Sequence, residues 1–396
     1  MKNIISSFYV LNTLCWLFSI VLWHKIMQHF QISILIQWLM SILLWINFYV
    51  LKFIFYYPVL TDSMAFLAGL ALAYFYVQNK IKQVCIVAFL GSFVYPLFAI
   101  YTCILILFPI DIKAREHQNS KKKYTFLWIT ILIVSLFAGM RTYYAYRIKY
   151  EISAGFHLNT LVYMLTYGYV LYHLLRPLRS LNKIVDYIPK LNWQRVVLVV
   201  LILLTTVLIK SYLSRHAQMG SPSQNYFLRS IFGIGYHGAT WIAQFFSGFG
   251  VIAVGLYIFL AKISQTVLQQ SVGMYILFAL AVLINLQLET RVIADIYVFI
   301  PLGLALTLQK YKWNINKKRL ILIVLLLNLA ISKVYLKIEG SKWFFHPVEL
   351  AWVPQNYALS TYLMKDGHYW ITLIVFAFIS VVVFLAAKRA KNWAEV

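Results

Sequence analysis

The stretch FYYPVLTDSMAFLAG, residues 55–69, places a single carboxylate, Asp62, between two long apolar runs. The acid follows Pro58 and opens an apolar segment that we predict to be a membrane helix. The chain has only 11 acidic residues, and 62% of its residues are hydrophobic. Because an acid at membrane depth is costly and often functional, the position of Asp62 needs a physical explanation.

The composition around this stretch indicates an all-α, polytopic integral membrane protein. The 396 residues have a mean hydropathy of +0.76 and only 12% are charged, which leaves too little polar surface for a soluble globule. The apolar runs are mostly about 17–25 residues long, enough for a helix to cross about 30 Å of hydrocarbon. We expect about 11–13 transmembrane helices, since backbone groups in lipid must be satisfied within each segment. The predicted spans are 4–23, 32–55, 61–78, 84–95, 96–108, 124–140, 157–175, 196–213, 241–261, 272–288, 293–309, 319–336 and 369–387.

The net charge of +24 does not indicate nucleic-acid binding, because most basic residues form short clusters between the spans. The positive-inside rule places these basic loops in the cytoplasm: 111–123, 176–195, 310–319 and the C-terminal tail. The loops then expected to face outward are 141–156, 214–240, 289–292 and 337–368. The three cysteines lie in apolar runs and form no disulfide or zinc pattern. We expect one membrane domain over 1–396, in a bacterial inner membrane.

The topology of the first hundred residues depends on Pro96. The run 84–108 is long enough for one span, but Pro96 removes a helical hydrogen bond in its middle. A short hairpin that turns there places Asp62 outside, whereas a single span places it in the cytoplasm. Counting Lys and Arg on each side does not separate the two models.

Asp62 itself has two compatible interpretations. As a helix start, Thr61 or Asp62 caps the following amides, and the carboxylate suits the positive end of the helix dipole. As a functional group, Asp62 binds a metal or orients a substrate, since a capping acid still has a second oxygen to offer.

A second polar group occurs in LETRVIADIYVFIPL, residues 288–302. We expect Glu289, Arg291 and Asp295 to open a helix, with Arg291 and Asp295 sharing a face because they are four residues apart. The two side chains then either neutralise each other, or Arg291 is left to bind a phosphate through its guanidinium fork.

The predicted outer loops supply further candidates. Residues 210–241 contain Arg215 and His216, and the GIGYHG of this loop lacks the strand that a dinucleotide site requires. RTYYAYRIKYE, residues 141–151, is typical of an interfacial aromatic belt, and Arg141 alternatively contacts a lipid phosphate or a sugar. The aromatic loop 337–368 is expected to lie along the interface or to stack on sugars.

Over roughly residues 5–110, the pattern resembles the glycosyltransferase C superfamily of polyprenyl-phosphate-sugar and dolichyl-phosphate-sugar transferases. The resemblance rests on PVLTD, the small residues of SMAFLAGLALAYFYV, the short loop NKIKQ and the broken pair VAFLGSFVYPLFAIY. ETRVIADIYVFIPL is similar to the late Arg-bearing helix of that family. The pattern begins at the second helix of the family, so the first helix and the first outer loop have no counterpart.

The resemblance implies a sugar transfer from a polyprenyl-phosphate donor on the outer face of the membrane. Asp62 matches the family acid that serves a divalent metal, Mg²⁺ or Mn²⁺, or the lipid phosphate, and this favours the hairpin topology. Arg291 and Arg215 are then expected to hold the phosphate. The family's general base normally lies in the first outer loop, so Glu289 and His216 are the candidates to replace it.

Other classes of function stay open at this point. Polysaccharide polymerases, flippases and transporters also place Arg and acidic side chains at membrane depth. A transporter often repeats a broken helix in corresponding halves, and Pro96 has no clear partner of this kind. A non-catalytic relative that keeps only the fold is the remaining alternative. In all of these cases the expected partners are membrane lipid and a lipid-linked sugar, and no nucleic acid.

Overall fold

The computed structural model describes most of the helical regions of the chain. The described residues are 2–47, 50, 62–95, 97–110, 125–148, 150, 152–180, 192–215, 240–284, 294–310, 317–331 and 366–389. Within these ranges every regular element is a helix, which confirms the predicted all-α class. The predicted outer loops 214–240 and 337–368 fall almost entirely outside the described residues.

The helices follow the predicted apolar runs, but some of them end six to nine residues later than predicted. Their bounds are α1 (Lys2–His29), α2 (Ile34–Trp45), α4 (Asp62–Val77), α5 (Ile81–Val94), α6 (Phe98–Leu107), α7 (Thr125–Arg147), α8 (Ala154–Leu175), the 3₁₀ helix η2 (Arg176–Ser180), α9 (Trp193–Ser214), α11 (Thr240–Phe249), α12 (Val251–Gln270), α13 (Val272–Ile284), α14 (Phe299–Leu308), α15 (Lys317–Ile331) and α17 (Asp366–Arg389).

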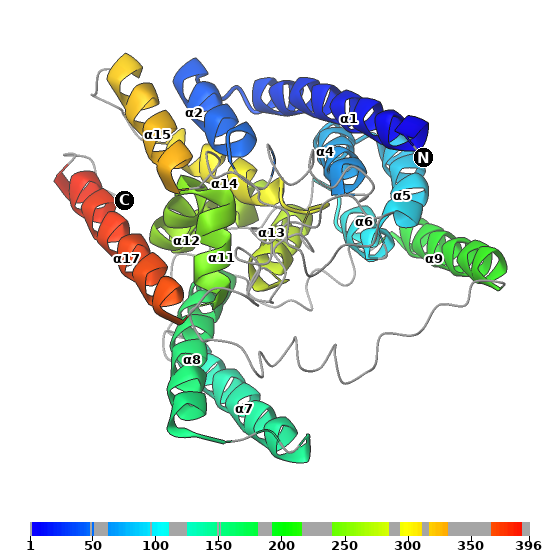
Figure 1. The fold of residues 1–396 in the computed structure, drawn as a ribbon. Coiled ribbons are helices and arrows are strands. Elements are labelled where there is room, and N and C mark those ends of the chain that lie inside the picture. Colours follow the sequence, from blue (N-terminus) through cyan, green and yellow to red (C-terminus); the bar gives the residue numbers. More distant parts are fainter. Residues whose placement is uncertain are drawn as a thin grey trace.

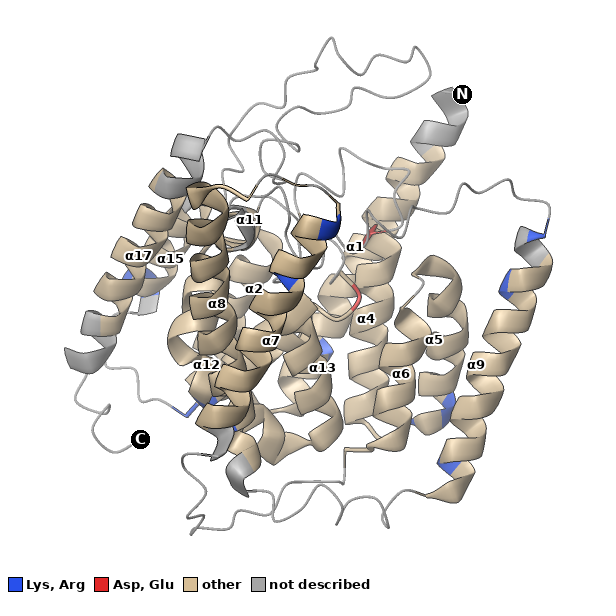
Figure 2. Ribbon diagram, turned by 90° about the horizontal axis from the view of Figure 1, so that it is seen from below, with Lys and Arg blue, Asp and Glu red and all other residues tan. Residues whose placement is uncertain are grey.

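Four of these helices are long and apolar enough to cross a membrane. The qualifying segments are Ser7–His29, Leu127–Arg147, Trp193–Tyr212 and Val251–Gln270. Many of the long helices run roughly side by side in Figure 2, and α7, α9 and α17 expose large apolar side chains along their outer faces. Exposed apolar faces of this size are a liability in water and are expected where lipid covers the helix.

α12 forms the centre of the bundle. In its most apolar window 67% of the residues are buried, compared with 22% in α7 and 17% in α9. α8, α11, α13, α14 and α17 all pack against α12, whereas α7 packs on α8 and α9 packs on α5 and α6 (Figure 1). The buried interior therefore surrounds α12, whereas α7 and α9 lie at the edge of the bundle.

The predicted break at Pro96 is found. α5 ends at Val94 and α6 begins at Phe98, and the two short helices pack against each other. With 14 and 10 residues, each is about 15–21 Å long, which is shorter than the hydrocarbon layer. This arrangement agrees with the hairpin model, while the side of the membrane on which Asp62 lies stays a prediction.

The predicted single span 241–261 is wrong, because the chain breaks at Gly250 between α11 and α12. Gly250 has φ = +63°, a left-handed conformation that side chains other than glycine rarely adopt. The Asn328 side chain occupies the space where a Cβ would lie and accepts a hydrogen bond from the Val251 amide at 3.0 Å. Asn328 also donates to the Ile46 carbonyl, so one amide joins α15, α12 and the end of α2.

Candidate functional site

Asp62 is the first helical residue of α4, and its side chain is buried, with 6% of its surface exposed. The carboxylate therefore lies at the positive end of the helix dipole, as the helix-start interpretation expects. The adjacent Ser63 donates a hydrogen bond to the side chain of Asn12 on α1. Two polar side chains thus fix the start of α4 against α1 inside an otherwise apolar interior.

Asp295 lies in a turn at residues 294–298, and α14 begins only at Phe299. The prediction that Asp295 opens a helix is therefore wrong, whereas Arg291 lies outside the described residues and its position relative to Asp295 stays a prediction. The turn packs directly on α4, where a Cβ at Gly69 would overlap the carbonyl oxygen of Asp295. Only the absence of a side chain at residue 69 lets the backbone of the turn approach this closely.

This packing brings the two acids together. The carboxyl of Asp62 lies close enough to that of Asp295 to interact with it electrostatically, although the two residues are far apart in the sequence. Asp295 is fully buried, with 0% of its surface exposed. In Figure 2 the segments coloured red lie close together beside α1 and α4. We call these two side chains the acid pair.

The surroundings of Asp295 do not satisfy its carboxyl. Neither oxygen accepts a hydrogen bond of normal geometry from a described residue, although the backbone amides of Asp295 and Ile296 lie nearby. The hydroxyl of Tyr101, on α6, interacts electrostatically with Asp295 and is itself buried without a hydrogen-bond partner among the described residues. A buried carboxyl without partners is expensive, so it requires a proton, a cation or a polar ligand.

Aromatic rings hold the acid pair in place. Trp45 on α2 makes edge-to-face contacts with Trp16 at 5.9 Å and with Phe66 at 5.6 Å between ring centroids. Phe66 lies one turn after Asp62 in α4, and its ring is 6.4 Å from that of Tyr297. Tyr297, two residues after Asp295, stacks on Phe249 of α11 at 4.1 Å. These contacts, each favourable by about 0.5–1.5 kcal/mol, join four helices and the turn around the pair.

Arg141, predicted to bind substrate, lies elsewhere in the fold. Its guanidinium stacks over the rings of Phe156 at 4.9 Å and Tyr163 at 4.6 Å, and its Nε donates to Thr160 at 3.0 Å. The side chain is 1% exposed, and these contacts all come from α8. They account for its burial by joining α7 to α8, and a role in substrate binding stays a prediction.

The remaining predicted residues are only partly described. Arg215 follows α9, is exposed, and stacks over the ring of Tyr212 at 5.0 Å. Glu289, Arg291 and His216 lie outside the described residues. Glu289 and Arg291 precede, in the sequence, the turn that carries Asp295.

The acid pair fits a hard cation in its ligand chemistry. Carboxylate oxygens are the ligands that Mg²⁺ and Mn²⁺ prefer, and Mg²⁺ commonly takes one or two carboxylates together with water and phosphate oxygens. No set of three His, Cys, Asp or Glu side chains that could hold a metal occurs among the described residues. Asp62 and Asp295 would therefore hold such an ion only together with water or substrate oxygens.

Sequence reasoning missed Asp295 as the partner of Asp62, and it missed Tyr101 and Asn12 altogether. The available signal was weak, because each is a single polar group within an apolar run. Comparisons with protein-family models, with curated proteins and with solved structures gave no match to this chain.

Proposed function

We propose that the chain is a polytopic protein of a bacterial inner membrane, with about 11–13 transmembrane helices, that transfers a sugar from a polyprenyl-phosphate donor. The observation that supports this proposal is the meeting of Asp62 with the turn at 294–298. The two segments are those for which the sequence resembles the glycosyltransferase C superfamily. These two segments meet in a buried interior lined by aromatic rings, and this supports the proposal that they form one site.

In the proposed reaction, Asp62 and Asp295 hold a divalent cation. When bound, such an ion neutralises the charge that develops on the leaving lipid phosphate. Arg291, four residues before Asp295 in the sequence, is proposed to bind the same phosphate through its planar fork. A carboxylate or imidazole takes the proton of the acceptor hydroxyl, and Glu289 and His216 are the candidates.

The test measures the thermal stability of the detergent-purified protein with and without Mg²⁺, Mn²⁺ and a short-chain polyprenyl phosphate. A ligand that binds only the folded state stabilises it by about 2.7 kcal/mol at a hundred times its Kd. Asp62→Asn keeps the geometry of the helix start but removes the negative charge that a hard cation requires. We expect Asp62→Asn and Asp295→Asn to lose the metal-induced stabilisation.

Asp366→Asn is the matched control, because Asp366 is the first residue of α17 as Asp62 is of α4. It should keep the full response to metal and to lipid phosphate. Equal metal stabilisation in all three variants would leave Asp62 as a helix-start residue and would remove the main support for catalysis.

A second candidate, cation-coupled transport, is favoured by one observation. Asp295 has no basic partner among the described residues, and its charged neighbour there is another acid. Buried acids of this kind occur on ion and proton pathways. Stabilisation by sodium ions that depends on Asp62 and Asp295, without any response to polyprenyl phosphate, would support transport against sugar transfer.

A further inference from the structure

Tyr101 places a hydroxyl beside the acid pair. The residue lies in α6, and 3% of its surface is exposed. Its hydroxyl oxygen is buried and has no hydrogen-bond partner among the described residues. The same hydroxyl interacts electrostatically with Asp295, neither of whose carboxyl oxygens accepts a hydrogen bond of normal geometry from the described part of the chain. A buried donor and a buried acceptor therefore lie near each other, and neither is satisfied.

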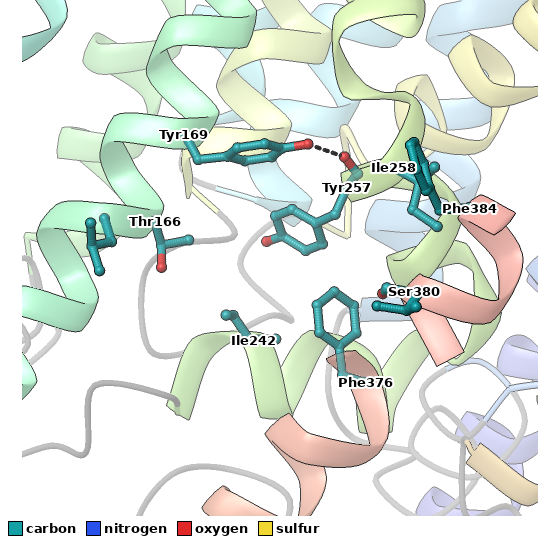
Figure 3. Close-up of a pocket in the computed structure, with 10 residues that line it drawn as sticks. Thr166, Tyr169, Ile242, Tyr257, Ile258, Phe376, Ser380 and Phe384 are labelled. Atoms are coloured by element: carbon teal, nitrogen blue, oxygen red, sulfur yellow. Dashed lines mark hydrogen bonds between the residues drawn. The ribbon is translucent and has the colours of Figure 1, made fainter. Parts of the chain in front are cut away.

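Two other tyrosines show how the fold satisfies such a hydroxyl. The Tyr169 hydroxyl donates to the backbone carbonyl of Tyr257 at 2.5 Å and joins α8 to α12 (Figure 3). The Tyr275 hydroxyl donates to the backbone carbonyl of Leu174. No carbonyl of the described residues takes this part for Tyr101. Because phenylalanine would supply the same ring, the hydroxyl of Tyr101 indicates a polar partner.

Asp295 needs a donor even when a cation is bound. A cation shared with Asp62 through one carboxyl oxygen of Asp295 leaves the other oxygen buried. A buried carboxylate oxygen without a donor is costly. Of the titratable side chains that interact with Asp295 in the described part of the chain, the ionised Asp62 has no proton to donate, whereas Tyr101 has one. The chemistry of Tyr101 therefore suits the second oxygen.

Both groups are held by packed backbone. Tyr101 lies at the end of the first turn of α6, which packs against α5, α9 and α13. A Cβ at Gly91 of α5 would overlap the ring of Phe98, so α5 and α6 are in close contact where α6 begins. Asp295 is held by the close approach of its turn to Gly69. A hydrogen bond between two groups on such rigid supports can orient a side chain.

The two groups make no direct hydrogen bond in the structure, so one water or a small side-chain rotation is needed to join them. A water that bridges two polar groups is nearly as favourable in enthalpy as a direct hydrogen bond. A buried water typically has about three polar partners. The carboxyl groups of Asp295 and Asp62 and the hydroxyl of Tyr101 are three such partners.

We propose that Tyr101 is a positioning residue of the acid pair. Its hydroxyl donates a hydrogen bond, directly or through one water, to one oxygen of Asp295 and leaves the other oxygen for a cation shared with Asp62. This inference deepens the proposed function and rests on it, because the cation is the one proposed to neutralise the lipid phosphate. Hydrogen bonds that orient metal ligands typically raise metal affinity by about 10- to 100-fold.

The experiment measures the affinity of the detergent-purified full chain for Mn²⁺ alone, from the paramagnetic resonance signal of the unbound ion. Tyr101→Phe keeps the ring and removes only the hydroxyl. We expect this variant to bind Mn²⁺ about 10- to 100-fold more weakly than wild type at neutral pH. The deficit should shrink at higher pH, because the lost hydrogen bond favours the ionised carboxyl that binds the ion, and a higher pH restores that form. A variant that merely loosened the fold would show the same deficit at every pH.

Tyr275→Phe is the matched control, because it also removes one hydroxyl from a buried tyrosine, in the neighbouring helix α13. It leaves the carbonyl of Leu174 without its donor, so the unfolding midpoint should fall. Its affinity for Mn²⁺ and the pH profile of that affinity should stay as in wild type. Tyr101→Phe should show the reverse, with a midpoint in the absence of metal that is close to wild type and a lower affinity.

An infrared measurement separates this inference from the proposed function, since it needs neither metal nor lipid. The carbonyl band of the protonated Asp295 carboxyl is the band that Asp295→Asn removes. We expect this band to persist to a higher pH in Tyr101→Phe than in wild type. If the wild-type chain binds no Mn²⁺ while the band shifts in this way, the cation of the proposed function is refuted and the positioning of Asp295 by Tyr101 stands.

Two outcomes would overturn the inference. Wild-type Mn²⁺ affinity together with an unshifted band in Tyr101→Phe would show that the hydroxyl does not act on Asp295, whether or not the chain transfers a sugar. A loss that occurs in Tyr297→Phe instead would assign the donor to Tyr297, whose hydroxyl is also buried without a partner among the described residues.

Discussion

The contact between Gly69 and the turn at Asp295 offers the most direct test of how the acid pair is built. Gly69→Ala adds a methyl group that would overlap the carbonyl oxygen of Asp295 and lie close to its carbonyl carbon and Cα. These are backbone atoms, so no side-chain rotation relieves the overlap, and either α4 or the turn must move. The control is Gly139→Ala in α7, where a Cβ would meet no described atom within 4 Å.

The magnitude follows from two opposing effects. Replacing glycine by alanine inside a helix favours the helix by about 0.8–1.0 kcal/mol, and this effect is common to both variants. Forcing an extra methyl into a packed interior costs about 1–3 kcal/mol, and this cost applies only at residue 69. We therefore expect Gly69→Ala to be about 1–3 kcal/mol less stable than Gly139→Ala. The midpoint shifts by about 2–4 °C per kcal/mol in chains of 150–250 residues, and by less in a longer chain.

The chain contains its own reporters for this measurement. Cys15 and Cys103 are each 5% exposed and unpaired, so a thiol-reactive fluorophore should label them mainly as the protein unfolds. Heating each detergent-purified variant with the fluorophore gives its midpoint. The displaced turn should also carry Asp295 away from Asp62 and reduce stabilisation by Mg²⁺. Equal midpoints and equal metal responses in the two variants would refute the close packing of the turn on α4.

Two further predictions follow from the same contacts. Arg141→Lys loses the flat guanidinium between two rings and should lower the free energy of unfolding by about 0.5–2 kcal/mol in the same thiol assay. The control is Arg147→Lys, on the exposed side of α7, which should stay within about 0.5 kcal/mol of wild type. Equal losses in both variants would contradict the stacking of Arg141. In a background without the native cysteines, Lys80→Cys in the exposed loop between α4 and α5 should react with an impermeant maleimide only after permeabilisation, whereas reaction in intact cells would contradict the outward placement of Asp62.

The sequence was sufficient for elements that depend on local chemistry. Long apolar runs predict helices because lipid leaves backbone groups no other partner, and α8 and α9 follow the predicted runs within three residues. Proline at residue 96 predicts the break between α5 and α6, since in the interior of a helix it removes a backbone hydrogen bond.

Breaks and contacts that depend on distant residues could not be predicted in this way. Glycine is frequent in transmembrane helices, so Gly250 alone does not indicate a break. Its left-handed conformation makes sense only with Asn328, a residue of another helix that caps Val251. The close approach at Gly69 likewise depends on a turn far along the chain.

The acid pair shows why an explanation of each acid from its own neighbours in the sequence was not enough. The helix dipole accounts for Asp62, and an ion pair with Arg291 would account for Asp295 if both lay on one helix. The turn at 294–298 removes the helical premise of the second explanation and brings its carboxyl to the first acid. A buried carboxyl beside a second acid is costly to keep without a partner, so the pair requires a cation, a proton or a polar ligand. Asp62 is therefore explained by its contact with Asp295. The residues next to Asp62 in the sequence do not indicate this contact.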